Sequence, residues 1–142
     1  MNVVDSCGWL EYMADGGNSG FFAAALQNEK ELLIPGVVIF EVCKRLGVLG
    51  QSAAAEAFLS VAGRCQIAHL SPADLARAAK AGIDHNLALA DAIIWQTVQT
   101  HQAKLYTQDV NLKGLPGVVF KAKPMLASSP RSSIKPTRKG SK

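Results

Sequence analysis

The chain has 142 residues, of which 49% are hydrophobic and 18% charged, and this fits one globular domain with a single core. Its formal net charge of +4 is unevenly distributed, because residues 1–120 carry 8 Lys and Arg against all 11 Asp and Glu. Residues 121–142 carry 7 basic residues and no acid. This pattern excludes a uniformly basic domain that coats nucleic acid and leaves a mildly acidic body.

Membrane-spanning, secreted, zinc-stabilised and disulfide-stabilised proteins are also excluded. The longest apolar candidate, Leu32 to Phe40, is interrupted by Pro35 and is much shorter than the roughly 18 residues of a membrane span. The N-terminus lacks the basic and apolar regions of a signal peptide, so we expect a soluble, cytoplasmic protein without membrane contact. The cysteines lack zinc-ligand spacing and are expected to be small buried residues: Cys7, Cys43 and Cys65.

Short continuous apolar runs occur along the chain between segments whose apolar residues recur at helical spacing, and this pattern predicts strands separated by helices. Strands are expected at residues 2–4, 32–34, 65–70, 104–107 and 118–121. Helices are expected at residues 9–13, 21–26, 38–49, 53–62, 72–81 and 89–99, the fifth being capped by Ser71 with Pro72 in its first turn. This order predicts an α/β fold with a central, mostly parallel sheet covered on both faces.

The C-terminal residues differ in composition from the rest of the chain. From residue 127 onward, Ser, Pro, Lys and Arg dominate and only one large apolar residue occurs, so this segment cannot contribute to a core. We therefore expect a domain over residues 1–126 and a basic, flexible tail over residues 127–142.

Four carboxylates stand where an α/β sheet places its binding crevice, after strands or on the helices that face their carboxyl ends. Asp5 and Asp109 follow predicted strands, whereas Glu41 and Asp91 interrupt strongly apolar stretches. Carboxylates gathered at one edge repel one another unless a divalent cation neutralises them, and an all-oxygen site favours Mg²⁺ or Mn²⁺. Because such a metal activates water and stabilises a phosphorane-like transition state, the pattern favours hydrolysis of phosphodiesters.

Each acid also has an ordinary structural interpretation. Asp5 and Asp109 could cap the turns that follow their strands, and Asp91 could be a first-turn acid favoured by the helix dipole. Glu41 could lie on a solvated helix face and pair with the basic residues three and four positions later.

Four motifs occur in order along about residues 2–122, each centred on one of these acids. They are Val3-Val4-Asp5-Ser6-Cys7-Gly8-Trp9-Leu10-Glu11-Tyr12, Ile34-Pro35 followed by Glu41-Val42 with Leu46, Leu89-Ala90-Asp91-Ala92-Ile93-Ile94, and Tyr106-Thr107-Gln108-Asp109 with Leu112. Together they resemble the PIN-domain ribonucleases, especially the small VapC-type toxins of toxin–antitoxin systems. The basic tail is not part of that family pattern.

The resemblance implies a PIN-like three-layer α/β/α fold and a divalent-metal-dependent endoribonuclease, the toxin of a VapBC-type pair. It implies an RNA substrate, a cognate antitoxin and a set of acids that are both catalytic residues and ligands of Mg²⁺ or Mn²⁺: Asp5, Glu41, Asp91 and Asp109. We also expect a homodimer. Thr107 matches a hydroxyl that the family often has in its last motif, and Asn111 stands where many relatives have another acid, so a fifth carboxylate is not assumed.

The sequence defines the substrate contacts less well than the acids. Single-stranded or loop RNA is the expected target, since an exposed phosphodiester must enter a cleft. The candidates for contacts with this RNA are Thr107, Lys44 and Arg45, with Lys80, Lys104 and Lys113 as further candidates for phosphate contacts. The alternatives are an acidic-cluster DNA nuclease and a catalytically silent module that binds a basic protein segment.

Overall fold

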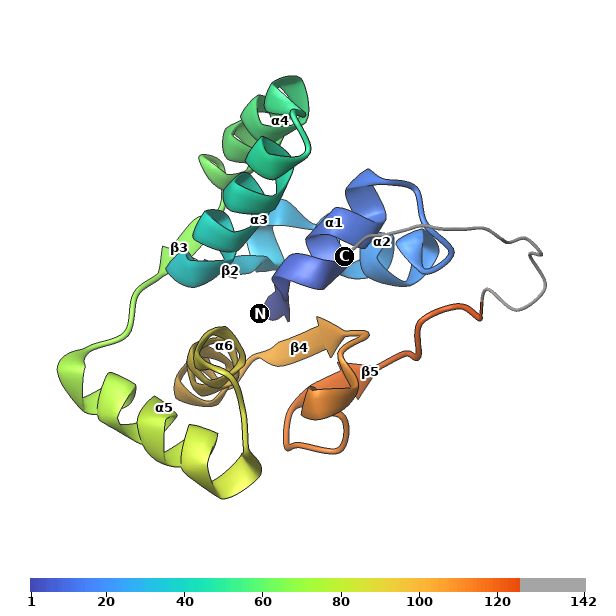
Figure 1. The fold of residues 1–142 in the computed structure, drawn as a ribbon. Helices are drawn as coiled ribbons and strands as arrows, with labels where there is room; N and C mark the ends of the chain where they lie inside the picture. The colour runs from blue at the N-terminus through green and yellow to red at the C-terminus, as the bar shows by residue number, and fades with distance from the viewer. Residues whose placement is uncertain (126–142) are drawn as a thin grey trace.

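The computed structural model of the protein describes residues 1–125, in which six α-helices alternate with five short strands (Figure 1). The strands are β1 (Asn2–Val4), β2 (Leu33–Pro35), β3 (Gln66–Ala68), β4 (Lys104–Thr107) and β5 (Val118–Phe120). The helices are α1 (Ser6–Met13), α2 (Ser19–Leu26), α3 (Gly36–Val48), α4 (Ser52–Ala62), α5 (Pro72–His85) and α6 (Leu89–His101). The predicted tail over residues 127–142 lies outside the described residues.

All predicted helices and strands are present, and the differences lie at their ends. Helix α5 continues about one turn past its predicted end at residue 81, because the left-handed residue that caps it, Asn86 (φ 54°), comes only after His85. Two 3-10 turns, Glu29–Glu31 (η1) and Val110–Leu112 (η2), were not predicted, since three residues carry no detectable periodicity. No helix within residues 1–125 is long and apolar enough to cross a membrane.

The strands of the described chain pair only in parallel, as predicted. Strand β4 lies between β1 and β5, with Leu105 opposite both Val3 and Val118. Strand β2 pairs with β3, and a bridge between Asn2 and Leu32 joins this pair to β1. The strand order is therefore β3-β2-β1-β4-β5, and the direction in which the chain crosses the sheet reverses between β1 and β4. A binding crevice opens at such a reversal, beyond the carboxyl ends of the strands.

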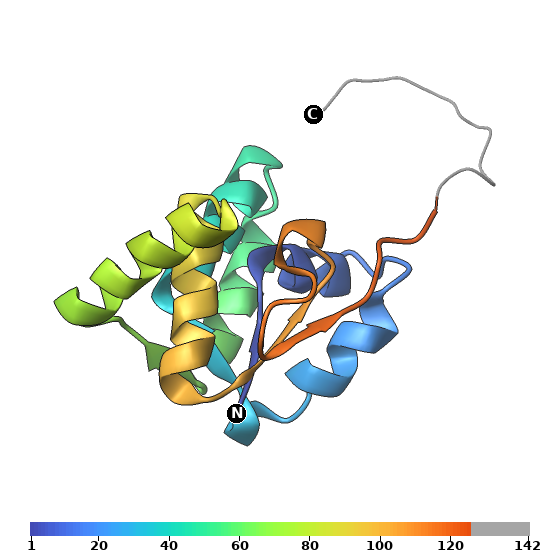
Figure 2. The same ribbon diagram turned by 90° about the horizontal axis from the view of Figure 1, so that it is seen from below.

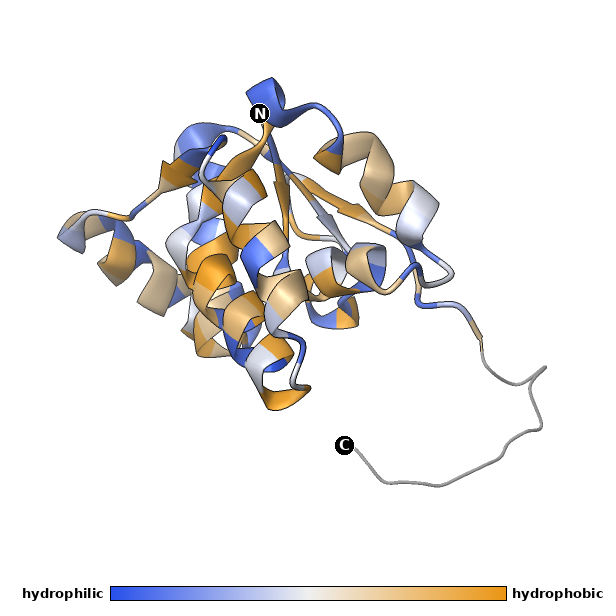
Figure 3. Cartoon of the chain, turned by 90° about the horizontal axis from the view of Figure 1, so that it is seen from above, coloured by the Kyte–Doolittle hydropathy of each residue, from blue (hydrophilic) through white to orange (hydrophobic). Residues whose placement is uncertain are grey.

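Helices cover both faces of this sheet, which confirms the three-layer α/β/α arrangement. Helices α1 and α2 lie on one side of β4, and α5 and α6 lie on the other side (Figures 1 and 2). The strands between them are mostly apolar (Figure 3). Their side chains form one core with the inward faces of the helices, and its fully buried members include Val3, Val4, Phe22, Ile94, Val98 and Leu105.

The prediction that the three cysteines are buried is wrong. Cys7 is exposed, and Cys43 and Cys65 are partly exposed. Cys7 lies on the first turn of α1, directly beyond the carboxyl end of β1, where the crevice leaves it uncovered. The three thiols are free, in agreement with the predicted lack of disulfides.

Gly8 sets the distance between α1 and the core. A methyl group at Gly8 would lie only 2.5 Å from Val4 Cγ1 and 2.7 Å from Phe22 Cε1. We therefore expect Gly8→Ala to lower the free energy of unfolding by about 1–3 kcal/mol, the usual cost of overpacking a core. Urea denaturation of both proteins measures this difference. The control is Gly47→Ala on α3, where a methyl group meets nothing within 4 Å and greater helix propensity should raise stability by up to about 1 kcal/mol. Equal effects of the two variants would contradict the close contact.

Candidate active site

Asp5 ends β1 and begins α1, and its two carboxylate oxygens have different partners. Oδ1 accepts a hydrogen bond from the backbone N–H of Gly8 at 2.9 Å and so caps the helix. Oδ2 accepts a hydrogen bond from the Thr107 hydroxyl at 2.5 Å. Asp5 is only 2% exposed, and this burial raises its pKa from the usual 3.8 to about 6, although both hydrogen bonds act in the opposite direction.

Thr107 connects Asp5 to Asp109. It ends β4, which is the neighbour of β1 in the sheet, and it is completely buried. Its hydroxyl donates to Asp5 Oδ2 and accepts from the backbone N–H of Asp109 at 2.9 Å. The sequence suggested Thr107 as a substrate contact, whereas its burial supports a role in positioning the two acids.

Asp109 and Asp91 form a pair at the same edge of the sheet. Asp109 begins η2, where its Oδ1 accepts a hydrogen bond from the backbone N–H of Asn111 at 2.9 Å. Asp91 lies in the first turn of α6. Partial burial raises the pKa of Asp91 to about 7, and a hydrogen bond with Asp109 and the charge of Asp109 add to this rise. The carboxyl group of Asp91 is therefore close enough to Asp109 for the two to influence each other's protonation.

Glu41 reaches the cluster from α3. Its Oε1 accepts a hydrogen bond from the Ser6 hydroxyl at 2.8 Å, and its charge contributes to the raised pKa values of Asp5 and Asp91. Within residues 1–125, Glu41 forms no ion pair, so the suggested pairing with the basic residues on the next turn of α3 is absent.

The structure thus brings all four predicted acids to the point where the strand order reverses. The capping interpretations of Asp5 and Asp109 are also correct, because Oδ1 of each carboxylate accepts a hydrogen bond from a backbone N–H at the start of the turn that follows. Within the described residues, no three acidic, histidine or cysteine side chains are already arranged to hold a metal ion. The donor chemistry nevertheless fits Mg²⁺ or Mn²⁺, because carboxylates whose charges raise one another's pKa are neutralised best by a hard cation.

A buried amide that the sequence did not single out holds one wall of the site. Asn18 is 2% exposed, and its Nδ2 donates to Gln108 Oε1 at 2.9 Å and to the carbonyl of Ala122 at 3.0 Å. Its backbone N–H donates to Glu11 Oε2 at 2.8 Å. The sequence indicated only a glycine-rich loop here, and a single sequence gives no signal that the amide in this loop is buried.

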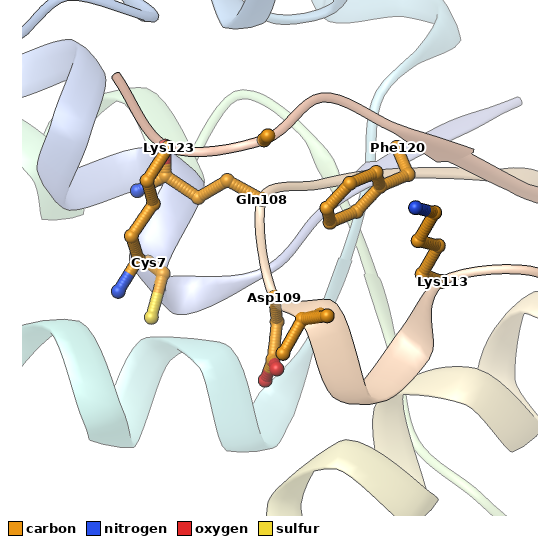
Figure 4. Close-up of a pocket in the computed structure, with 8 residues that line it drawn as sticks. Cys7, Gln108, Asp109, Lys113, Phe120 and Lys123 are labelled. Atoms are coloured by element: carbon orange, nitrogen blue, oxygen red, sulfur yellow. The ribbon is translucent and has the colours of Figure 1, made fainter. Parts of the chain in front are cut away.

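A cavity of about 430 Å³ opens beside the acids (Figure 4). Its labelled lining residues come from α1, the end of β4, η2 and the segment around β5: Cys7, Gln108, Asp109, Lys113, Phe120 and Lys123. The Nζ atom of Lys113 lies 5.3 Å from the centre of the Phe120 ring. Although Cys7 is exposed as a residue, desolvation of its thiol by the surrounding groups, followed by the charge of Asp5, raises the pKa of this thiol to about 11.

The other basic candidates lie at different places. Lys104 begins β4 and therefore lies at the edge of the sheet opposite to the acids. Lys80 is paired with Asp84 on α5 at 2.8 Å. Lys44 and Arg45 are exposed on the turn of α3 that follows Glu41. Of the six candidates for RNA contacts, Lys113 alone lines the cavity beside the acids.

Replacement of Thr107 tests whether its hydroxyl positions the acids. If Asp5 is a metal ligand of the nuclease that the sequence predicts, Thr107→Val should lower the cleavage rate by about 10–100-fold, the usual cost of losing an outer-shell partner of a metal ligand. Thr107→Ser keeps the hydroxyl and should restore most of the rate. The pH–rate profile of the valine variant should shift to higher pH, because the Thr107 hydrogen bond lowers the pKa of Asp5. An unshifted profile would indicate a purely structural role.

Comparison with known protein families matches residues 3–118 to the PIN domain. A comparison with curated protein sequences gives no match. The family match spans all four predicted motifs, which lie between Val3 and Leu112, and it confirms the resemblance inferred from the sequence.

Solved structures of similar fold were also found. One is a toxin–antitoxin complex from Klebsiella pneumoniae, with a TM-score of 0.69 and 22% identity over 84% of this chain and 96% of that chain. Another is VapBC2 from Rickettsia felis bound to a DNA fragment from its promoter, with a TM-score of 0.63 and 14% identity over 85% and 97%. A third is VapC20 from Mycobacterium tuberculosis, a toxin that cleaves the sarcin–ricin loop, with a TM-score of 0.63 and 15% identity over 83% and 98%. At these identities the similarity establishes the fold.

Proposed function

Because the chain belongs to the PIN domain family, we propose that it is a divalent-metal-dependent endoribonuclease and the toxin of a VapBC-type toxin–antitoxin pair. The main support for this proposal is that four carboxylates lie close together where the strand order reverses: Asp5, Glu41, Asp91 and Asp109. The similarity to solved toxin–antitoxin proteins supports the same assignment.

The four acids would hold Mg²⁺ or Mn²⁺, which supplies an activated water and stabilises negative charge on the phosphoryl group. Thr107 fixes the carboxylate of Asp5 and the backbone of Asp109 relative to each other. The Ser6 hydroxyl donates a hydrogen bond to the Glu41 carboxylate and so orients it. Burial and the neighbouring Asp109 raise the pKa of the Asp91 carboxyl group to about 7, and a bound cation would lower this pKa and favour the charged form that can ligate it.

We propose RNA as the substrate, a cognate antitoxin as the inhibitor, and action in the cytoplasm. An inhibitory segment with Arg or Lys would be complementary to the acidic site. Exposed apolar residues on α5 and α6 support the predicted homodimer, since Leu75, Ile83 and Leu89 are 45%, 81% and 78% exposed. Apolar side chains gathered on one exposed surface are typical of protein contacts.

The test is cleavage of single-stranded RNA by the purified chain after removal of metal and after addition of Mg²⁺ or Mn²⁺. We expect cleavage only with metal, and we expect expression of the wild-type protein, but not of Asp5→Asn, to arrest growth. Cleavage of DNA alone would support the DNA nuclease alternative. Absence of cleavage on both substrates would support the silent binding module.

A further inference from the structure

The cavity beside Asp109 is not explained by the four acids. Asp109 belongs to both, so a substrate whose phosphodiester meets the acids must place an adjoining group in or near this cavity. The volume of about 430 Å³ falls in the range of sites that hold a small organic group. We call this the Phe120 cavity, and its lining residues include Cys7, Gln108, Asp109, Lys113, Phe120 and Lys123.

The chemistry of the Phe120 cavity is that of a nucleotide site. Phe120 offers a partly exposed aromatic ring, and stacking on such rings is the sequence-tolerant way in which proteins hold single-stranded bases. Lys113 lies beside the ring and Lys123 lines the other side of the cavity next to Cys7 (Figure 4), while residues 1–120 as a whole carry more acids than bases. These lysines would attract phosphates and would repel the basic segment of a protein inhibitor.

One wall of the cavity is fixed before any ligand binds. The buried Asn18 side chain donates to Gln108 and to the carbonyl of Ala122, and both residues line the cavity. This network ties the end of β4 to the segment that follows β5. The ring of Phe120 and the acids therefore belong to one connected frame, which lowers the cost of ordering a flexible ligand.

We propose that the Phe120 cavity is a subsite for the nucleotide next to the scissile phosphate of single-stranded RNA. The base lies against Phe120, and Lys113 and Lys123 contact the flanking phosphates. This inference rests on the proposed ribonuclease function and adds the residues that hold the substrate. It also assigns a role to Lys123, which the sequence did not suggest.

Binding to a catalytically impaired full-length chain tests the aromatic contact. In an Asp5→Asn background with Mg²⁺, the affinity for a fluorescein-labelled, mixed-sequence RNA of eight nucleotides is measured by anisotropy. We expect Phe120→Leu to weaken binding by about fivefold or more, as loss of base stacking does. The control is Tyr12→Leu on α1, because Tyr12 is 36% exposed but lines neither the Phe120 cavity nor the pocket that contains Glu41.

The lysine contacts have a separate readout. We expect Lys113→Met and Lys123→Met each to reduce the slope of log affinity against log salt by about 0.7, the value for one lost contact to a single strand. Lys104→Met removes an exposed charge at the opposite edge of the sheet and should leave the slope unchanged. The proposal is overturned if Phe120→Leu binds as tightly as its parent, or if the three lysine variants share one slope.

Cleavage kinetics separate this proposal from the proposed function. If the chain with Asp5 intact cleaves RNA and Phe120→Leu keeps the same KM and the same preference among cut sites, the subsite is wrong and the ribonuclease stands. If the chain cleaves no RNA but binds the labelled strand through Phe120, the contact between Phe120 and RNA stands, whereas the ribonuclease function and the placement of this contact beside a scissile phosphate are wrong. Circular dichroism of each variant confirms that the fold is kept.

Discussion

Asp5→Asn is expected to lower the proposed RNA cleavage by more than about 100-fold, since replacing a proposed metal ligand should cost more than losing an outer-shell partner. The fold should be retained, because the amide oxygen of asparagine can still accept from the Gly8 N–H and its Nδ2 can donate to the Thr107 hydroxyl. The hydrogen bond that caps α1 is thus preserved, and the one between residues 5 and 107 is kept with its direction reversed, while the negative charge is lost.

Thermal unfolding of the metal-free protein should distinguish lost chemistry from lost structure. Burial raises the pKa of Asp5, which means that its charged form destabilises the folded state, so the variant should melt at the same temperature as wild type or higher. The matched control is Glu56→Gln on α4, an exposed acid outside the cluster, which should keep full cleavage. Cleavage by Asp5→Asn close to the wild-type rate in Mg²⁺ or Mn²⁺ would remove Asp5 from the proposed site.

Stability of the metal-free protein is expected to fall as pH rises from about 4 to about 7. The pKa of Asp5 is about 6 in the folded chain against a usual 3.8, so the folded state binds the proton more tightly than the unfolded state does. The stabilisation from this proton is complete below pH 4 and is lost as pH rises through 6. A difference of roughly two pKa units corresponds to about 3 kcal/mol at most. Asp91, with a pKa of about 7, acts in the same direction.

Urea denaturation at pH 4.5 and pH 7.5 measures this effect. The loss of unfolding free energy between the two pH values should be smaller in Asp5→Asn than in wild type by up to about 2 kcal/mol, because at pH 4.5 part of the stabilisation is already lost. Groups outside the site, such as Glu29 with its lowered pKa, change both proteins equally and cancel in the comparison. Mg²⁺ or Mn²⁺ at pH 7.5 should restore stability to wild type more than to the variant. Equal pH dependence of the two proteins would contradict a buried, proton-binding Asp5.

Local patterns were enough to predict the elements and to select the four acids. Strands and helices follow from apolar spacing and caps within a few residues, as in the Ser71-Pro72 start of α5. Asp5 and Asp109 could be chosen because each directly follows an apolar strand. Glu41 and Asp91 could be chosen because a charge inside an apolar stretch requires compensation. The motifs built around these residues then identified the family.

The tertiary structure alone decided how these residues are connected. Thr107 and Asp5 are 102 positions apart, and Asn18 and Ala122 are 104 positions apart, yet each pair is joined by a hydrogen bond. Sequence periodicity reports whether a side chain faces the core, but it carries no information on which strand is the neighbour or where a helix face points. For this reason the exposure of Cys7, the network of Asn18 and the cavity around Phe120 could not be predicted, whereas the acids that they surround could.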